Sequence, residues 1–116
     1  MADELRLGVV LSFSKGSAGV NKTANIEVDV AGDSYVSAVQ EIGTTEEVLV
    51  EPDALGTPGY VYVRNMDATN YVEVGITASY TIKLLAGDFA LFPAAAAIYA
   101  KANTAACNVE YIIIEL

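Results

Sequence analysis

The chain has 116 residues, of which 53% are hydrophobic, with 15 acidic and six basic residues, one cysteine and no histidine. This length suits one core, and no linker or composition shift marks a boundary, so residues 1–116 are expected to form a single domain. Without histidine there is no imidazole for a catalytic triad or a metal site, and a lone cysteine closes no intrachain disulfide or thiolate zinc cage. We therefore expect no enzyme, no cofactor and no metal.

The net charge of −9 also excludes classes of partner. Nucleic-acid binding depends on Lys and Arg that displace counterions, and an anionic membrane surface repels an acidic protein, so neither partner is expected. The N-terminal sequence lacks the pattern of a secretory signal, and no apolar stretch reaches the roughly 20 residues that cross a bilayer. Synthesis in the cytoplasm, with Cys107 reduced, is the resulting expectation.

Alternating apolar and polar residues predict strands from the start of the chain. Over residues 5–13 five apolar side chains share one face: Leu5, Leu7, Val9, Leu11 and Phe13. Over residues 25–30 Ile26, Val28 and Val30 are expected to face inward, with the acidic residues between them in water. Strands are also predicted over residues 34–42 and 46–50. The loop of residues 51–59 holds two prolines and two glycines and cannot continue a ladder.

The second half of the chain repeats the alternation at a closer spacing. Strands are predicted over residues 60–65, 71–76, 80–84, 88–92, 98–102 and 108–116. Turn signals about every 8–12 residues are typical of a sandwich or barrel. The fold class is therefore all-β: a jelly roll or a related antiparallel β-sandwich of about nine or ten short strands, without a helix longer than about two turns. The largely apolar residues 111–116 predict a central strand that is buried on both faces.

The sequence predicts no catalytic, cofactor-binding or metal-binding residue. The glycines do not form a phosphate-binding loop. The densest carboxylates are Glu46 with Glu47 and Glu51 with Asp53. Neighbouring strand residues point to opposite faces and the second pair lies in the loop, so local structure sets up neither pair as an acid and base.

An aromatic group on the strand of residues 60–65 is the first candidate for a binding surface. Tyr60, Tyr62 and Arg64 share one face, while Val61 and Val63 on the other face suit a core. Tyr and Arg contribute much of the binding energy at protein interfaces. Ordinary packing of half-buried rings against the next strand explains the pattern equally well, and both interpretations stay open.

Several segments resemble small virion structural proteins of tailed bacteriophages: residues 40–47, 59–75, 85–92, 98–106 and 109–115. The resemblance covers most of the chain and consists of strand and turn patterns. It implies a jelly-roll or sandwich subunit on the outer surface of the virion capsid, bound to the lattice of the major capsid protein. It also implies a homo-oligomer, most simply a trimer, and carries over no catalytic residue.

The leading hypothesis is a capsid decoration (cement) protein that stabilises the shell. The alternatives are a tail, fibre or neck component of the virion and, from another class, a carbohydrate-binding β-sandwich module. Recognition of the assembled shell is expected through residues 1–7 and 51–59, because termini and loops adapt to a curved lattice and several weak patches engage together. The candidate contact residues are Met1, Ala2, Asp3, Glu4, Leu5, Arg6, Pro52, Leu55, Pro58, Tyr60, Tyr62 and Arg64.

Overall fold

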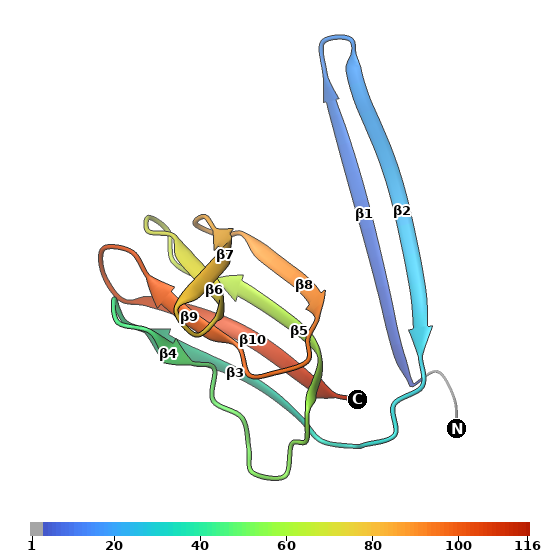
Figure 1. Ribbon diagram of the computed structural model, residues 1–116. Coiled ribbons are helices and arrows are strands. Elements are labelled where there is room, and N and C mark those ends of the chain that lie inside the picture. The colour runs from blue at the N-terminus through green and yellow to red at the C-terminus, as the bar shows by residue number, and fades with distance from the viewer. Residues whose placement is uncertain (1–3) are drawn as a thin grey trace. The chain divides into compact units, whose positions relative to one another are not determined.

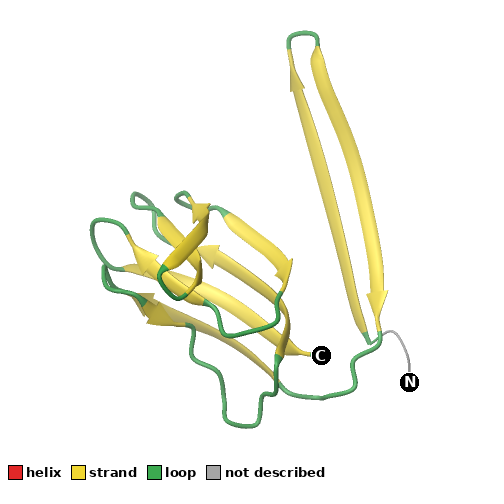
Figure 2. Cartoon of the chain, in the orientation of Figure 1, coloured by secondary structure: helices red, strands yellow, loops and turns green. Residues whose placement is uncertain are grey.

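A computed structural model describes residues 4–116, and these residues form ten strands and no helix (Figures 1 and 2). The predicted all-β class and strand number are confirmed. The chain divides into two compact units, Met1–Ala31 and Gly32–Leu116, where its length led us to expect one domain. The first unit is separate because its two strands pair only with each other.

The first unit contains a long antiparallel hairpin, which we call the arm. Strand β1 (Leu5–Lys15) pairs with β2 (Ala18–Val28) in an unbroken register that ends at a two-residue turn. Gly16 has a φ of +59°. A glycine with positive φ at the first central position is typical of the type II′ turns that join tightly paired strands. Ile26, which the sequence led us to place against a core, is 49% exposed on the arm.

The second unit is an antiparallel sandwich of two four-stranded sheets. We call the first, with strand order β3-β10-β5-β8, the long sheet, and the second, with order β4-β9-β6-β7, the short sheet. The strands are β3 (Tyr35–Ile42), β4 (Glu47–Val48), β5 (Pro58–Asn65), β6 (Val72–Ile76), β7 (Ser79–Leu84), β8 (Phe89–Pro93), β9 (Tyr99–Ala102) and β10 (Cys107–Glu115).

The core of the sandwich lies between the inner faces of the two sheets. Alternation along β5 buries Val61 and Val63 completely, as predicted, and leaves Tyr60 and Tyr62 half-buried. Val72 and Val74 of β6 meet them from the short sheet in one continuous apolar cluster. Full burial of a Val or Ile side chain stabilises a fold by about 1.5–3 kcal/mol, so this cluster is the main stabilising feature of the sandwich.

The last strand of the chain lies in the middle of the long sheet, which confirms its predicted central position. β10 pairs with β3 on one side and with β5 on the other. Its inner face is fully buried at Ile113, whereas Ile112 and Ile114 on the outer face are only half-buried. The predicted burial of this strand on both faces is therefore wrong, because the core cluster lies against the inner face alone. The long sheet thus has one covered and one accessible face.

One polar side chain is fully buried, among the residues the structure describes. Asn65, at the end of β5, donates hydrogen bonds from Nδ2 to the carbonyl oxygens of Asn70 (2.8 Å), Leu84 (3.1 Å) and Leu85 (3.2 Å). Its Oδ1 accepts one from the backbone N–H of Asp67 at 2.9 Å. A buried amide with this many partners holds together the ends of three strands and the loop of residues 66–70.

Candidate interaction surfaces

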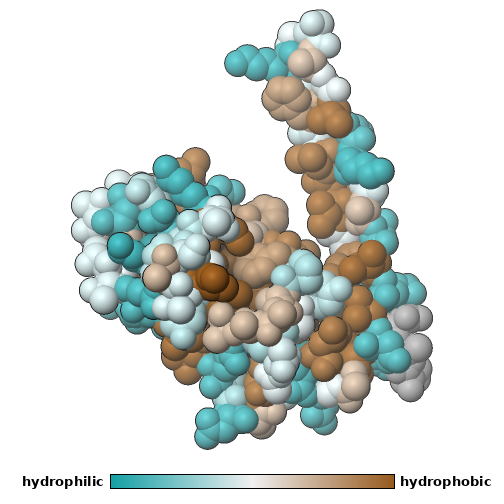
Figure 3. All heavy atoms as spheres, viewed as in Figure 1, coloured by the Kyte–Doolittle hydropathy of each residue, from teal (hydrophilic) through white to brown (hydrophobic). Residues whose placement is uncertain are grey.

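The arm has one apolar and one polar face. Register pairs such as Leu5 with Val28 and Phe13 with Val20 place apolar residues across from each other along its length. The apolar face consists of Leu5, Leu7, Val9, Leu11, Phe13, Lys15, Ala18, Val20, Lys22, Ala24, Ile26 and Val28. The opposite face is polar apart from Val10. Residues 8–27 are all exposed, and Figure 3 shows apolar side chains in brown along the arm.

The outer face of the long sheet is the second accessible apolar surface. Each of its four strands contributes: Tyr35 and Val39 from β3, Ile112 and Ile114 from β10, Tyr60 and Tyr62 from β5, and Phe89, Leu91 and Pro93 from β8. Tyr35, Val39 and Phe89 are each more than 60% exposed. The centroids of the Tyr62 and Phe89 rings lie 6.3 Å apart, so these two rings form an aromatic pair on this face.

Charge is distributed unevenly between the two units. Residues 32–116 carry eleven acidic and three basic side chains, a net charge of −8. In the arm, residues 8–26 carry Lys15 and Lys22 and no acidic residue. Both lysines lie on the apolar face of the arm. A protein surface that binds this face is therefore expected to be apolar and acidic.

The N-terminal contact candidates lie partly outside the described residues: Met1, Ala2 and Asp3 belong to the segment that the structure leaves out. Glu4 accepts a hydrogen bond from the backbone N–H of Val30 at 2.9 Å, which closes the base of the arm. Arg6 pairs with Glu27 across the two strands, with an Nε–Oε1 distance of 3.6 Å. Both side chains are more than half exposed, so this pair adds little stability. Leu5 begins the apolar face of the arm.

The candidates in the loop of residues 51–59 separate into exposed and buried side chains. Pro52 is exposed, and its carbonyl oxygen accepts a hydrogen bond from the N–H of Leu55 at 3.0 Å. Leu55 is 8% exposed and Pro58 is buried, so these two side chains fix the loop on the sandwich and are not available to a partner. The exposed tip consists of residues 52–54.

The predicted group on β5 lies together on the outer face of the long sheet. Tyr60 and Tyr62 are half-buried there and Arg64 is exposed. Their neighbours across the strands are Ile112 and Ile114 of β10. The contribution of β3, β8 and β10 to this face could not be predicted from the sequence, because no single segment reveals the strand order that brings them together.

Glu115 connects the C-terminal end of β10 to two loops. Its carboxylate accepts hydrogen bonds from the backbone N–H groups of Gly56 at 2.6 Å and Ser34 at 3.1 Å. These hydrogen bonds hold the pKa of Glu115 below its ordinary value, because they favour the charged form. The loop of residues 51–59 and the segment entering β3 are thereby fixed to the same side chain.

Replacing Glu115 with glutamine is expected to reduce the loss of stability in acid. Because the folded-state pKa is lowered, the carboxylate stabilises the fold above the pKa of an unfolded glutamate and loses this effect as the pH falls through the lowered value. Urea denaturation from about pH 6 to pH 3, which brackets the ordinary glutamate pKa of about 4.3, should show the difference between wild type and variant shrinking with acidity.

The matched control for this prediction is Glu41→Gln on the outer face of β3, whose carboxylate accepts no hydrogen bond from the described residues. The Glu115→Gln difference from the wild type should depend more steeply on pH than the difference for this control. Equal pH dependence of the two variants would contradict the role assigned to the Glu115 carboxylate.

The acidic pairs singled out in the sequence act in separate turns. Glu46 accepts hydrogen bonds from Thr77 Oγ1 at 2.7 Å, from the N–H of Ala78 at 2.6 Å and from the Tyr80 hydroxyl. These bonds lower the pKa of Glu46 and support a turn in which Ala78 has a φ of +61°. Glu47 instead accepts from the N–H of Gly43 at 2.6 Å. Their contacts are those of turn-stabilising residues.

The second acidic pair, Glu51 and Asp53, has no common hydrogen-bond partner among the described residues. Oε2 of Glu51 is buried with no hydrogen-bond partner among the described residues, and burial raises the pKa of this carboxyl group. Asp53 lies in the exposed tip of the loop. The two carboxyl groups therefore have different environments, but no other described residue joins them to form a catalytic group.

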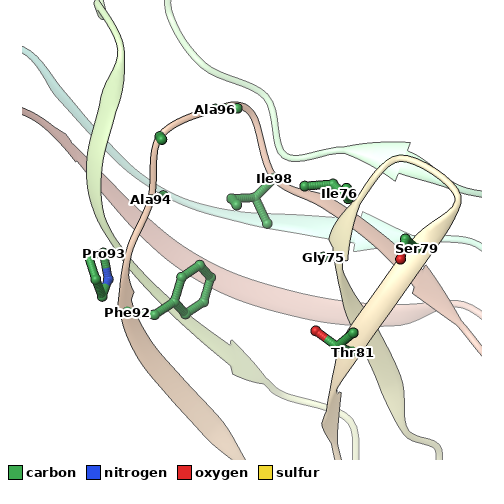
Figure 4. A pocket seen from close by; sticks show the side chains of 10 residues that line it. Gly75, Ile76, Ser79, Thr81, Phe92, Pro93, Ala94, Ala96 and Ile98 are labelled. Atoms are coloured by element: carbon green, nitrogen blue, oxygen red, sulfur yellow. The ribbon is translucent and has the colours of Figure 1, made fainter.

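An apolar hollow of about 420 Å³ opens beside the β6–β7 hairpin and the corner after β8 (Figure 4). Phe92, Ile98 and Ile76 line it, with hydroxyl groups only from Ser79 and Thr81. Ala94, Ala95 and Ala96, which follow β8, form part of its wall. A hollow with so few polar groups offers little to orient a polar ligand.

Within residues 4–116, no group of three or more His, Cys, Asp or Glu side chains is arranged to hold a metal ion. Cys107 is buried, and desolvation raises the pKa of its thiol, which disfavours the reactive thiolate.

None of the described residues form a helix long and apolar enough to cross a membrane. No family model, curated protein or solved structure matches the chain.

Proposed function

We propose that this protein is a structural component of a tailed-bacteriophage virion that decorates the outer surface of the capsid and binds the lattice of the major capsid protein. The observation that carries the proposal is the amount of accessible apolar surface. Fifteen large hydrophobic side chains are exposed among the described residues. Monomeric soluble proteins rarely expose large continuous apolar patches, which are typical of surfaces that become covered on assembly.

The same proposal includes a jelly-roll topology for the sandwich. In chain order the eight sandwich strands form sheets of order 1-8-3-6 and 2-7-4-5, and only β6 and β7 are successive strands that share a sheet. Crossing from sheet to sheet at the other connections supports two interlocked Greek keys, as in jelly-roll subunits. We also propose a homo-oligomer, with a trimer as its simplest form, because a closed ring hides apolar surface without fibre growth.

Two alternatives differ in measurable ways. A tail, fibre or neck component would occur in about a dozen copies or fewer per particle, whereas a decoration protein would occur in hundreds, so the mass ratio to the major capsid protein in purified particles distinguishes them. A carbohydrate-binding module would present exposed rings beside Asp or Asn. Tyr60 and Tyr62 lie beside Ile112, Ile114 and Leu91, which favours contact with protein.

The shell contact is proposed to include the exposed loop tip of residues 52–54. Replacing Ala54 with tryptophan is expected to weaken binding to empty shells by about tenfold or more, since a bulky ring disrupts a complementary contact and every 1.4 kcal/mol changes affinity tenfold. The matched control is Ala68→Trp, at an exposed position in the loop between β5 and β6. Co-sedimentation with shells measures both variants.

The same assay with unassembled capsid subunits tests recognition of the lattice. Wild-type protein should pellet with shells and bind isolated subunits much more weakly, because several symmetry-related patches engage together on a shell. Equal binding to shells and subunits would contradict lattice recognition. Failure to bind shells at all would overturn the decoration role, and equal loss by the two tryptophan variants would remove the loop tip from the contact.

A further inference from the structure

We propose that the apolar face of the arm of one copy packs on the outer face of the long sheet of a second copy, so that copies of the protein are joined by their arms. The inference deepens the proposed self-association and does not depend on binding to a capsid. It follows from two apolar faces, one in each unit, and from the charges that each carries.

The arm needs a covering surface to be stable. A two-stranded hairpin alone is marginal at best in water, because each strand has one neighbour and no sheet or helix packs on it. Leu11 and Phe13 of β1 and Val20 of β2 are each about half exposed on the apolar face, in the distal part of the arm. Removal of apolar area from water is favourable in proportion to the area covered, so ten apolar side chains on one face favour association.

The outer face of the long sheet matches the arm in extent and composition. At about 3.4 Å per residue, the eleven-residue strands of the arm are about 37 Å long and the nine-residue β10 about 30 Å. Nine apolar or aromatic side chains cover that face, and the most exposed are at its two edges, Tyr35 on β3 and Phe89 on β8. Where two sheets pack face to face in a sandwich, apolar and aromatic side chains of this kind lie between them.

The charges favour this occupant over a second arm. The apolar face of the arm carries Lys15 and Lys22 and no acidic residue, so two arms packed together would bring four lysines to one interface. The outer face of the long sheet carries Glu41 and Glu110, with Arg64 as its one basic residue, on a unit of net charge −8. Like charges across an interface oppose association, whereas complementary charges select the partner.

The first test changes the arm. Leu11→Asp places a carboxylate on its apolar face, and Val10→Asp, one residue away, places the same group on the opposite, polar face, where Val10 is 73% exposed. Sedimentation velocity of the full chain at micromolar concentration should show association weakened by about tenfold or more for Leu11→Asp and by less than about twofold for Val10→Asp. Equal behaviour of the two variants would overturn the proposal.

The second test restores the interface by mixing. The double variant Tyr35→Lys and Phe89→Lys alters two residues that are more than 60% exposed, so the sandwich is expected to keep its fold, as circular dichroism would verify. It should not self-associate, since its outer face now repels the lysines of the arm. Mixed with Leu11→Asp, it should form a hetero-oligomer, because one chain supplies an intact arm and the other an intact sheet face.

Each outcome of the mixing experiment has a defined meaning. A mixture that stays monomeric would overturn the proposal that arms join the copies. Variants that each associate as the wild type does would also overturn it, and would indicate that other surfaces join the copies or cover the arm. Shell binding is measured separately with the wild-type chain. A protein that binds shells but shows no rescue on mixing would contradict this inference and leave the decoration role intact.

Discussion

Replacing Asn65 with leucine is expected to lower the free energy of unfolding by about 2–4 kcal/mol, although the two side chains are similar in size. Leucine fills the space but leaves the carbonyl oxygens of Asn70, Leu84 and Leu85 without their amide donor and the N–H of Asp67 without its acceptor. Buried groups left unsatisfied lose their hydrogen bonds without regaining those with water. Urea denaturation followed by circular dichroism measures the change.

The control for Asn65 is Asn108→Leu, at an exposed position on β10. It makes the same chemical change where water can satisfy the backbone, so its effect should stay within about 0.5 kcal/mol. If both variants have the stability of the wild type, the hydrogen bonds of Asn65 are not what holds these strand ends together.

Replacing Ile113 with alanine is expected to destabilise the sandwich by about 2–5 kcal/mol. Ile113 is fully buried at the centre of the long sheet, with Val36 and Val61 as its neighbours on β3 and β5. The paired strands of a sheet cannot shift one by one to fill the space of the lost methyl groups, so a cavity remains. The midpoint of urea denaturation should fall without a change in slope.

Ile112→Ala is the matched control, since it truncates the same residue type at the next position of the same strand. Ile112 is half-buried on the outer face, between Ser37 and Tyr62, so its replacement should cost less than half as much stability in dilute protein. On the proposed interface it should instead weaken self-association. A variant of Ile112 that destabilises the monomer as much as that of Ile113 would contradict the assignment of inner and outer faces.

Most strands of the sandwich could be predicted from the sequence, and the reason is local. Alternation along residues 60–65 and 108–116 reports directly which side chains face a core, and β5 and β10 are found within two residues of the expected bounds. Residues 46–50 are an exception, because only Glu47 and Val48 form β4. The strand is short since its pairing with β9 covers just those two residues.

The arm illustrates what alternation does not reveal. The pattern over residues 5–13 predicts a strand with one apolar face, but it does not say whether that face meets the core of its own chain or another surface. Residues 14–24 were not predicted as strand, because Lys15, Gly16 and Ser17 interrupt the alternation. In the structure these residues form the turn that lets both strands extend to eleven residues.

The acidic residues whose hydrogen bonds hold loops and turns could not be identified from the sequence, for a different reason. Glu115 bonds to Gly56 and Ser34, which are 59 and 81 residues away along the chain. Glu46 bonds to Thr77 across 31 residues. No local spacing encodes such pairs, so acidic residues that support turns look in the sequence like any other solvent-exposed carboxylate.

The place of β10 has a consequence for how the protein folds as it is synthesised. β3 and β5 are separated in the long sheet by β10, which follows them by many residues in the sequence, so the sheet cannot be completed until β10 has left the ribosome. The arm pairs with itself and is available from the start, with its apolar face uncovered. Topologies dominated by such distant pairings fold slowly, in about milliseconds to seconds. During that interval the nascent chain exposes apolar residues of both units and depends on its acidic charge, or on chaperones, to avoid aggregation.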